Sequence, residues 1–562
     1  MIKIDNSNKQ TCVGCGACMQ ACPCKCISMK ADDEGFLYPS VDTDACSGCG
    51  RCEAVCPVMA VTSCDNTNNK TEGSDPADPV AVGGFHKNED ILEHSSSGGA
   101  FSLFADRIID ENGVVCACKL DDTLTAVHSF ATSPEDIASF CGSKYVQSDI
   151  GQSYLGIKEY LQEGRKVLFV GTPCQCAGLR SYLGDDPDNL IVCDFICHGV
   201  PSPLVFKKYI EGAEKAAGEK ITEFRFRTKD RDWVQSGMQQ GTEAVLQSGK
   251  KISKHPAYKD EFMNGFLSDI MLRPSCYECA FKSLPKSYSD ITIADFWGVG
   301  KVLPKLNNPK GTSLILLNSA KGISLFESVK DDFEFEYIDT KAAIRKNRSI
   351  IRSSPLNSMR YYFFDELKEK GYESVSRKYF TPFKWAVSTA LKRGWGIIES
   401  VIRAVLGPLV TRLFPKWDEK KWESLMQFFK FSLVGVSNSV VSYTINILTL
   451  LSLRPLGLEY DYIIANLTAF TLSVLWSYNL NSKHVFTIRQ GEVRSKGKTL
   501  LKTYASYAFS GIILNNVLGT FWIKIVGISR FIAPLLNLVI TIPTNFILNK
   551  YWAYRRKDEK QA

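Results

Sequence analysis

Two cysteine runs near the start of the chain constrain its fold more than any other feature. Each reads Cys-x2-Cys-x2-Cys-x3-Cys-Pro. Three closely spaced thiolates suit three irons of a four-iron cluster, and the fourth cysteine points towards the other cluster. Zinc gives no reason for the third cysteine or the trailing proline. The spacing predicts two [4Fe-4S] clusters, one held by Cys12, Cys15, Cys18 and Cys56, the other by Cys46, Cys49, Cys52 and Cys22.

The segment that carries these runs resembles bacterial two-cluster ferredoxins. It is short and poor in long apolar runs, so metal ligation must supply most of its folding energy. Clustered cysteines in a chain of 562 residues favour metal over disulfides, and the polar start of the chain lacks the apolar core of a signal peptide. We therefore expect this part in the reducing cytosol. Three cysteines are left over, and the first could confuse the ligand assignment around Cys22: Cys24, Cys26 and Cys64.

Composition divides the chain into five segments. A polar linker separates the cysteine-rich start from a region where short apolar runs that look like buried strands, such as Ser313–Leu317, alternate with helical stretches such as Phe101–Asp110 and Pro203–Ala217. A basic, tryptophan-bearing stretch follows, which suits either a membrane interface or a solvated connector helix. The overall charge of +7 is modest, and we expect no nucleic-acid partner. The expected fold is multidomain: a ferredoxin-like α+β domain (1–63), a linker (64–79), a mixed α/β flavoprotein domain (80–380), a basic amphipathic connector (381–427) and a four-helix transmembrane domain (428–562).

Several strings in the α/β region resemble the coenzyme F-420 hydrogenase/dehydrogenase beta-subunit family, and they occur in the family's order. They are Ser95–Phe101, Gly142–Gln147, Val170–Gln175, Cys197–Ser202, Cys276–Cys279 and Ser289–Gly298. The resemblance implies a flavoprotein, with FAD, that passes electrons between iron–sulfur clusters and the flavin. It also leaves open the use of F-420 itself.

Four cysteines of this region are candidate ligands of a third [4Fe-4S] cluster, because family relatives carry a cluster here: Cys174, Cys197, Cys276 and Cys279. Buried structural cysteine is the alternative, and Cys176 or Cys193 could replace one member. His198 and Asp295 are the candidate catalytic residues. His198 could tune the cluster, move a proton or serve structure alone, and Asp295 could lie by the flavin or simply pack.

The candidate flavin-binding residues precede predicted helices. Ser97, Gly98 and Gly99 allow close backbone approach at a helix N-terminus, which favours a phosphate, although a helix cap explains them as well. Lys144 could pair with a flavin phosphate or lie at the surface. Thr172 and Pro173 follow an apolar strand, where functional residues often lie.

The chain after Lys430 holds four uncharged runs long enough to span a bilayer: Phe431–Leu453, Tyr462–Ser482, Thr503–Ile523 and Phe531–Asn549. The loop 483–502 carries six Lys or Arg against one Glu, and the tail from Lys550 carries five against two acids. The positive-inside rule assigns both to the cytoplasm. We expect a multi-pass protein of the cytoplasmic membrane whose redox domains and C-terminus face the cytoplasm. The exits Asn481–Phe486 and Asn549–Tyr554 are similar, which indicates either two related hairpins or ordinary interface chemistry.

This last region resembles the GtrA-like family, through Phe429–Gly435, Asn438 and the two exits just described. The resemblance implies four spans and handling of polyprenyl-phosphate-linked sugars for cell-surface polysaccharides. Three functions remain open. In the first, the chain is a membrane-tethered flavin and iron–sulfur oxidoreductase that takes electrons from a redox partner such as ferredoxin and works with polysaccharide-synthesis enzymes. In the second, it is a lipid-linked-sugar translocation component with a regulatory redox domain. In the third, it is an F-420-dependent oxidoreductase.

Overall fold

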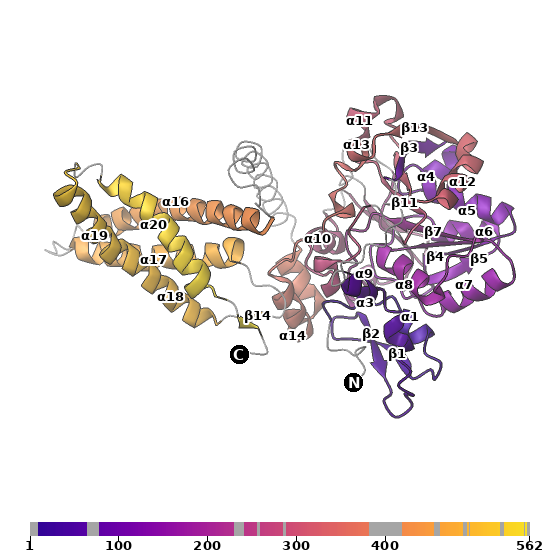
Figure 1. Cartoon of the computed structure of the whole chain (residues 1–562), viewed down its shortest axis with the longest axis horizontal. Helices are drawn as coiled ribbons and strands as arrows, with labels where there is room; N and C mark the ends of the chain where they lie inside the picture. The colour runs from indigo at the N-terminus through magenta and orange to yellow at the C-terminus, as the bar shows by residue number, and fades with distance from the viewer. Residues whose placement is uncertain are drawn as a thin grey trace. The chain divides into compact units, whose positions relative to one another are not determined.

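The computed structural model describes residues 9–64, 78–229, 241–255, 259–284, 288–380, 419–453, 461–486, 492–493, 495–528, 533–555 and 557–558. The chain forms two compact units, Met1–Val387 and Ser388–Ala562 (Figure 1). Most of the expected linker and connector lies outside the described residues. The multidomain organisation, with a mixed α/β domain and a helical C-terminal unit, agrees with the expectation.

The cysteine-rich start folds as a small α+β module. Its antiparallel hairpin pairs β1 (Ile27–Ala31) with β2 (Leu37–Val41), and its helices are α1 (Ala17–Gln20), α2 (Arg51–Ala54) and α3 (Pro57–Cys64). Gly16 and Gly50 precede α1 and α2 with φ of 72° and 70°, a backbone conformation that glycine adopts without strain. The two cysteine runs therefore wrap through tight turns into short helices.

An eight-stranded mixed sheet forms the core of the central domain, in the order β13-β3-β12-β11-β7-β6-β4-β5. The strands β4, β6, β7 and β11 are parallel neighbours, and every other pair is antiparallel. Their bounds are β3 (Val80–His86), β4 (Val114–Leu120), β5 (Ala126–Ala131), β6 (Val167–Gly171), β7 (Leu190–Phe195), β11 (Ile291–Asp295), β12 (Ser313–Leu317) and β13 (Phe333–Ile338).

Helices cover this sheet because apolar stripes line one side of each. They include α4 (Glu89–His94), α5 (Ala100–Asp110), α7 (Ser153–Gln162), α8 (Pro173–Leu183) and α12 (Ala320–Val329), with short turns at α6 (Pro134–Ile137), η1 (Ala138–Phe140), α11 (Val299–Val302), η4 (Pro304–Leu306), η5 (Lys330–Asp332), α13 (Thr340–Ile344) and η6 (Arg348–Ile350). The strand β12 is fully buried, which explains its unbroken apolar run.

A second layer packs around an aromatic core that contains Phe206, Phe226 and Phe262. It comprises α9 (Pro203–Ala217), α10 (Glu261–Leu267), α14 (Arg360–Tyr379), the turn η3 (Pro274–Glu278) and a three-stranded sheet of β8 (Ile221–Arg225), β9 (Thr242–Leu246) and β10 (Lys251–Lys254). Phe36 and Tyr38 of the cysteine-rich module belong to the same core, so module and central domain share one interior.

The tip of the module's hairpin docks into the central domain through ion pairs. Arg360, which is 1% exposed, binds both carboxylate oxygens of Glu34, and Lys368 pairs with Asp33 at 2.5 Å. The Ser202 hydroxyl donates to the Glu34 carbonyl, and a Cβ on Gly35 would overlap Leu204. A buried, bidentate Arg–carboxylate pair fixes geometry strongly, so these contacts hold the module in one orientation on the central domain.

The second unit is helical. Its segments are α16 (Glu419–Leu453), α17 (Asp461–Leu480), α18 (Lys496–Ala508), α19 (Asn515–Thr520) and α20 (Ala533–Leu548), joined by π-helical turns η8 (Asn481–Val485), η9 (Phe509–Leu514), η10 (Phe521–Ile525) and η11 (Asn549–Ala553), with a short pair β14 (Glu492–Val493) and β15 (Lys557–Asp558). Within the described residues, one stretch, Ser424–Leu453, is long and apolar enough to cross a membrane. The four-span arrangement therefore remains an expectation.

The two similar exits of this unit have the same local structure. The turns η8 and η11 each span five residues and close with the same bond, from Phe486 N–H to the Asn481 carbonyl and from Tyr554 N–H to the Asn549 carbonyl, both 2.8 Å. The Phe486 and Tyr554 rings stack with centroids 4.7 Å apart. Elsewhere in the unit Asn446 donates to Asn466 at 2.8 Å, so these two asparagines join neighbouring helices.

Candidate functional site

The first cysteine set comes together where the module meets the central domain. Burial raises the pKa of Cys15 to about 12, and the nearby thiols of Cys12 and Cys56 raise it further. The pKa of Cys18 is likewise raised by burial, then by Cys15, Cys12 and Cys56. Each of the four predicted members therefore lies close enough to the others to act on their charge.

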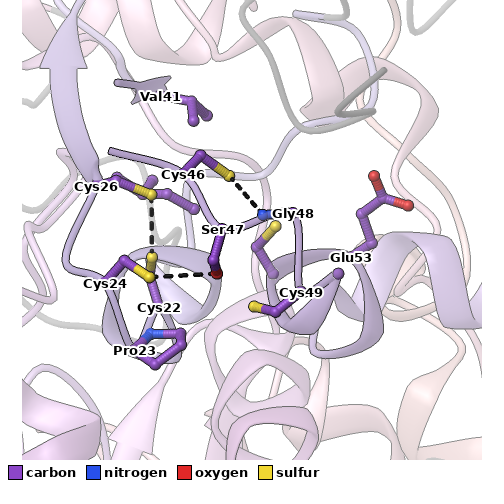
Figure 2. Close-up of a pocket in the computed structure, with 13 residues that line it drawn as sticks. Cys22, Pro23, Cys24, Cys26, Val41, Cys46, Ser47, Gly48, Cys49 and Glu53 are labelled. Carbon is purple, nitrogen blue, oxygen red and sulfur yellow. Dashed lines mark hydrogen bonds between the residues drawn. The ribbon is translucent and has the colours of Figure 1, made fainter. Parts of the chain in front are cut away.

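The second set lines an open pocket of about 150 Å³ at the module's surface (Figure 2). Cys22, Cys46, Cys49 and Cys52 all line it, and Cys49 is exposed. Two of the leftover cysteines lie there too. Cys26 Sγ is 3.4 Å from Cys22 Sγ, and Cys24 donates to the Ser47 hydroxyl at 3.3 Å. Spacing alone did not reveal this crowding of thiols around Cys22.

The third set forms at the carboxyl edge of the parallel strands. Cys174 and Cys197 follow β6 and β7, which are adjacent, and the turn η3 brings Cys276 and Cys279 to them. Burial raises the pKa of Cys174 well above its ordinary value, and Cys279, Cys197 and Cys276 add to this rise. Carboxyl ends of parallel strands are the usual place for a site in an open α/β sheet. By contrast, Cys176 points back into the sheet and donates to the Gly171 carbonyl.

Helix α8 and Tyr154 are close to both the first and the third sets. Cys174 is the second residue of α8, and a Cβ on Gly178, one turn further on, would lie 2.9 Å from Cys15 Cβ. The buried Tyr154 hydroxyl donates to the Gln175 carbonyl at 2.8 Å. After burial, the thiols of Cys15, Cys176 and Cys174 are the neighbours that raise the pKa of Tyr154. One side chain is thus within electrostatic reach of both sets.

The donor chemistry fits iron–sulfur clusters. Several members of the first and third sets are buried thiols with raised pKa values, so as thiolates they need nearby positive charge, which cluster irons supply. Among the described residues, no three His, Cys, Asp or Glu side chains converge on a point where one ion would bind. A cubane binds each thiolate through a different iron and therefore takes ligands spaced more widely than a single ion does.

The Ser97–Gly99 loop closes one end of the sheet ahead of α5. Ser97 Oγ donates to the Thr312 carbonyl at 2.9 Å, and Ser313 Oγ accepts from Gly98 N–H at 2.9 Å. A Cβ on Gly98 would lie 2.6 Å from the Gly84 oxygen, so packing against β3 and β12 already requires glycine there. Gly99 has φ 83° and caps α5. The close backbone approach that the sequence indicates is made, but towards neighbouring strands.

The remaining candidate flavin-binding residues stabilise local structure: Lys144, Thr172 and Pro173. The Lys144 ammonium donates to three carbonyls, those of Phe140 (2.7 Å), Cys141 (2.9 Å) and Ser139 (3.3 Å), and burial lowers its pKa. It is therefore no free surface lysine, and phosphate binding would require release of these bonds. Thr172 caps α8 in a capping box with Gln175, and Pro173 is the first residue of that helix.

Both candidate catalytic residues are held in pairs. His198 Nε2 lies 2.6 Å from an oxygen of buried Asp269. Asp295 ends β11 and binds Arg227 through both carboxylate oxygens, at 2.9 and 3.1 Å. The Tyr145 hydroxyl accepts from the same guanidinium at 3.5 Å. The first pair orients His198 beside the third set, and the second orients Asp295 at the edge of the sheet.

Three basic residues near these sites escaped the sequence reasoning: Arg227, Lys229 and Arg273. Lys229 donates to the Leu92 carbonyl and, at 2.7 Å, to the Ser97 carbonyl. Burial and, next to it, the charge of Arg227 lower the pKa of Lys229 to about 7. The sequence signal for Arg227 and Lys229 is the basic string from Arg225 to Lys229, which by itself has no specific meaning, and Arg273 lies outside that string.

Comparison with family models defines the class of protein. Residues 11–60 match the 4Fe-4S dicluster domain, so the chain is an iron–sulfur protein. Residues 81–153 match the N-terminal domain, and residues 164–342 the C-terminal domain, of the coenzyme F-420 hydrogenase/dehydrogenase beta subunit. Residues 430–554 match the GtrA/DPMS transmembrane domain. The chain thus carries both domains of the F-420 hydrogenase/dehydrogenase beta subunit, preceded by a 4Fe-4S dicluster domain and followed by a GtrA-like membrane domain.

Two individual proteins are similar to part of the chain. Coenzyme F-420 hydrogenase subunit beta of Methanococcus voltae is 29% identical over 110 residues, 18% of this chain and 38% of that protein. The chain thus spans little more than a third of that relative. A chain of the xenon-derivatised F-420-reducing [NiFe] hydrogenase complex from Methanosarcina barkeri matches with a TM-score of 0.35 and 16% identity, over 50% of this chain and 90% of that one.

Proposed function

We propose that this protein is a membrane-tethered iron–sulfur flavoprotein oxidoreductase that passes electrons from its ferredoxin-type clusters to FAD. The observation that carries the proposal is that the first and third cysteine sets meet along one face of α8, where Cys174 lies at the helix start and Cys15 packs against Gly178 one turn later. When bound, the clusters would carry single electrons and the flavin would carry hydride chemistry. The eight cysteines of the module would hold two clusters, and Cys174, Cys197, Cys276 and Cys279 a third.

The chain's own residues support such a site in specific ways. Cys174 lies in the first turn of α8, where the helix dipole stabilises a thiolate. The Lys282 ammonium donates to the Cys197 carbonyl and, at 2.7 Å, to the Ser349 carbonyl, which brings positive charge beside the set. Val200 N–H donates to Cys276 Sγ at 3.4 Å. Each contact favours the anionic form of a ligand thiol.

The flavin would lie near the Ser97–Gly99 loop, with Lys229 beside it. The N-terminus of α5 and the Lys229 ammonium both favour a phosphate. Thr172 and Pro173 would then shape the sheet edge between flavin and third cluster. In this proposal His198 and Asp295 hold or move protons beside the acceptor, and their partners Asp269 and Arg227 orient them.

The exposed second set suits a redox partner such as ferredoxin. Cys49, Gly48 and Gly50 are exposed, and nothing lies within 4 Å of a Cβ built on either glycine. A partner can therefore approach this pocket closely. In this proposal electrons flow from the surface through the first set towards the central domain.

The GtrA-like unit would anchor the enzyme at the cytoplasmic membrane, with redox domains and C-terminus in the cytoplasm. We propose that the enzyme serves cell-surface polysaccharide biosynthesis beside polyprenyl-phosphate-linked sugars. The match to the GtrA/DPMS domain supports this role and equally supports one alternative, a translocation component whose redox domains regulate it. The other alternative, an F-420-dependent oxidoreductase, draws on the family of the central domain.

Purification of the full chain in anoxic detergent, followed by flavin analysis and assays with reduced ferredoxin and with F-420, tests the proposal. We expect bound FAD that reduced ferredoxin bleaches. Absence of flavin under these conditions would overturn the oxidoreductase proposal in favour of the translocation role. Turnover with F-420 would instead select the F-420-dependent alternative.

A further inference from the structure

Arg273 is a fully buried cation that no carboxylate of the described residues neutralises. It is 1% exposed, like Arg360, yet Arg360 binds Glu34 through both carboxylate oxygens. The two acidic side chains that share the surroundings of Tyr38 with Arg273 are already committed, since Asp32 pairs with Lys9 at 2.7 Å and Glu34 with Arg360. Burial of an uncompensated charge is unfavourable. A negative group bound beside Arg273 would compensate its charge.

The guanidinium of Arg273 points at the first cysteine set. Its Nε donates to the Cys12 carbonyl at 2.9 Å, and one terminal nitrogen donates to the Leu37 carbonyl at 2.9 Å and lies 3.7 Å from Cys12 Sγ. The other terminal nitrogen donates to Gln147 Oε1 at 3.0 Å, and the plane stacks over the Tyr38 ring, with its carbon 4.2 Å from the ring centroid. A Cβ on Gly14 would lie 2.7 Å from the guanidinium, so the cysteine run itself is shaped to admit it.

The same residue also touches the third set, through its main chain. The Arg273 carbonyl accepts from Cys276 N–H at 2.9 Å. The charge of Arg273 opposes the rise in pKa that burial causes at both Cys15 and Cys276. No such cation lines the pocket of the second set, whose charged lining residue among those described is Glu53. The first set is thus distinguished by a buried positive charge.

We propose that Arg273 is the counter-ion of the first cluster and raises its reduction potential, so that this cluster accepts electrons despite its burial. The inference rests on the proposed function in one respect, that the first set holds a [4Fe-4S] cluster. Such a cluster with four thiolates is anionic and gains one further negative charge on reduction. A fixed cation beside it favours the reduced form, whereas burial alone disfavours that form.

The test is a redox titration of the full chain, purified anoxically and followed by electron paramagnetic resonance. Arg273→Met and Arg273→Gln remove the charge, and Arg273→Lys keeps the charge but loses the planar fork. We expect a tenfold or greater fall in the ratio of reduced to oxidised first cluster at fixed potential in the Met and Gln variants, about 59 mV for one electron. The Lys variant should stay near wild type, and the second cluster should not move.

A matched control is the double variant Arg360→Met/Glu34→Gln, which removes an equally buried guanidinium from the same contact without changing net charge. It should leave the first cluster's potential unchanged. The Cys49→Ala variant, which lacks a second-set ligand, identifies the first cluster's signal.

Equal potentials in wild type and a charge-removing variant with full iron content would overturn the proposal. If the Met and Gln variants lose iron, retention by the Lys variant supports a requirement for charge, whereas equal loss in all three overturns it. A wild-type chain that binds clusters but no flavin contradicts the proposed function and leaves this comparison intact.

Discussion

Buried cations in the redox unit differ in what neutralises them. Arg360 has Glu34 and Arg227 has Asp295, whereas Arg273 donates to the uncharged oxygens of Cys12, Leu37 and Gln147. Lys229 donates to the carbonyls of Leu92 and Ser97, beside the proposed flavin loop. Burial without a strong counter-charge lowers the pKa of Lys229 to about 7. This lysine is therefore close to titration at neutral pH.

The affinity for FAD should depend on the protonation of Lys229. A bound phosphate stabilises the ammonium and raises its pKa, so binding is strongest below about pH 7, where the lysine is already protonated, and weakens above it. We expect a loss approaching tenfold per pH unit between about pH 7 and 8.5, measured by flavin fluorescence with the apo-flavin protein. The Lys229→Met variant should bind FAD more weakly, and its affinity should not fall with pH over this range. A variant with the wild-type slope would show that another group titrates.

At the scale of elements, helix α8 packs closely against the cysteine-rich module. A Cβ on Gly178 would lie 2.9 Å from both Cys15 Cβ and the Tyr154 hydroxyl, closer than real side chains pack. By contrast, a Cβ on Gly212 in α9 would meet only Tyr372, at 3.8 Å. Both glycines lie inside helices, Gly178 in α8 and Gly212 in α9, but the space around them differs.

Alanine at these two positions should have opposite effects. Alanine favours a helix by up to about 1 kcal/mol over glycine, so Gly212→Ala should raise the free energy of unfolding by about that amount. In Gly178→Ala, overpacking that costs about 1–3 kcal/mol should outweigh this gain and displace Cys15, with loss of iron. Denaturant unfolding under anoxic conditions and iron analysis measure both effects. A stabilised Gly178→Ala variant with full iron would contradict the close contact.

Local elements could be predicted well from the sequence because their signals are local. The bounds expected for the strand Ser313–Leu317 and the helix Pro203–Ala217 match β12 and α9. A buried apolar run defines the strand, and Ser202, Pro203 and Gly218 mark the helix ends. The prediction of four spans could not be settled in the same way, because among the described helices one stretch alone is long and apolar enough to cross a membrane.

Long-range contacts could not be predicted. Arg273 and Cys12 are 261 residues apart, and nothing in the string around Arg273 indicates a thiol partner. Similarly, Gly98 could be recognised as a position of close approach, but Ser313 and Gly84 as its neighbours depend on the strand order. The members of each expected cysteine set lie close together, whereas the charges around them depend on tertiary structure.

At the scale of the whole molecule, the expected orientation in the membrane follows from the basic loop 483–502 and the basic tail. All twenty cysteines lie before residue 280, so new cysteines in the last segment report topology cleanly against a cytoplasmic background. Glu459→Cys should react with a membrane-impermeant maleimide on intact cells, and Glu492→Cys only after lysis. The reverse pattern would invert the orientation and place the redox domains outside.

The central claim is a relay of three clusters in one chain, and iron analysis tests it most directly. The anoxically purified wild-type chain should hold about twelve irons, four for each cluster. The Cys276→Ser/Cys279→Ser variant, which removes two ligands of the third set, should hold about eight. About eight irons in both proteins would contradict the third cluster and, with it, the path from the module to the central domain.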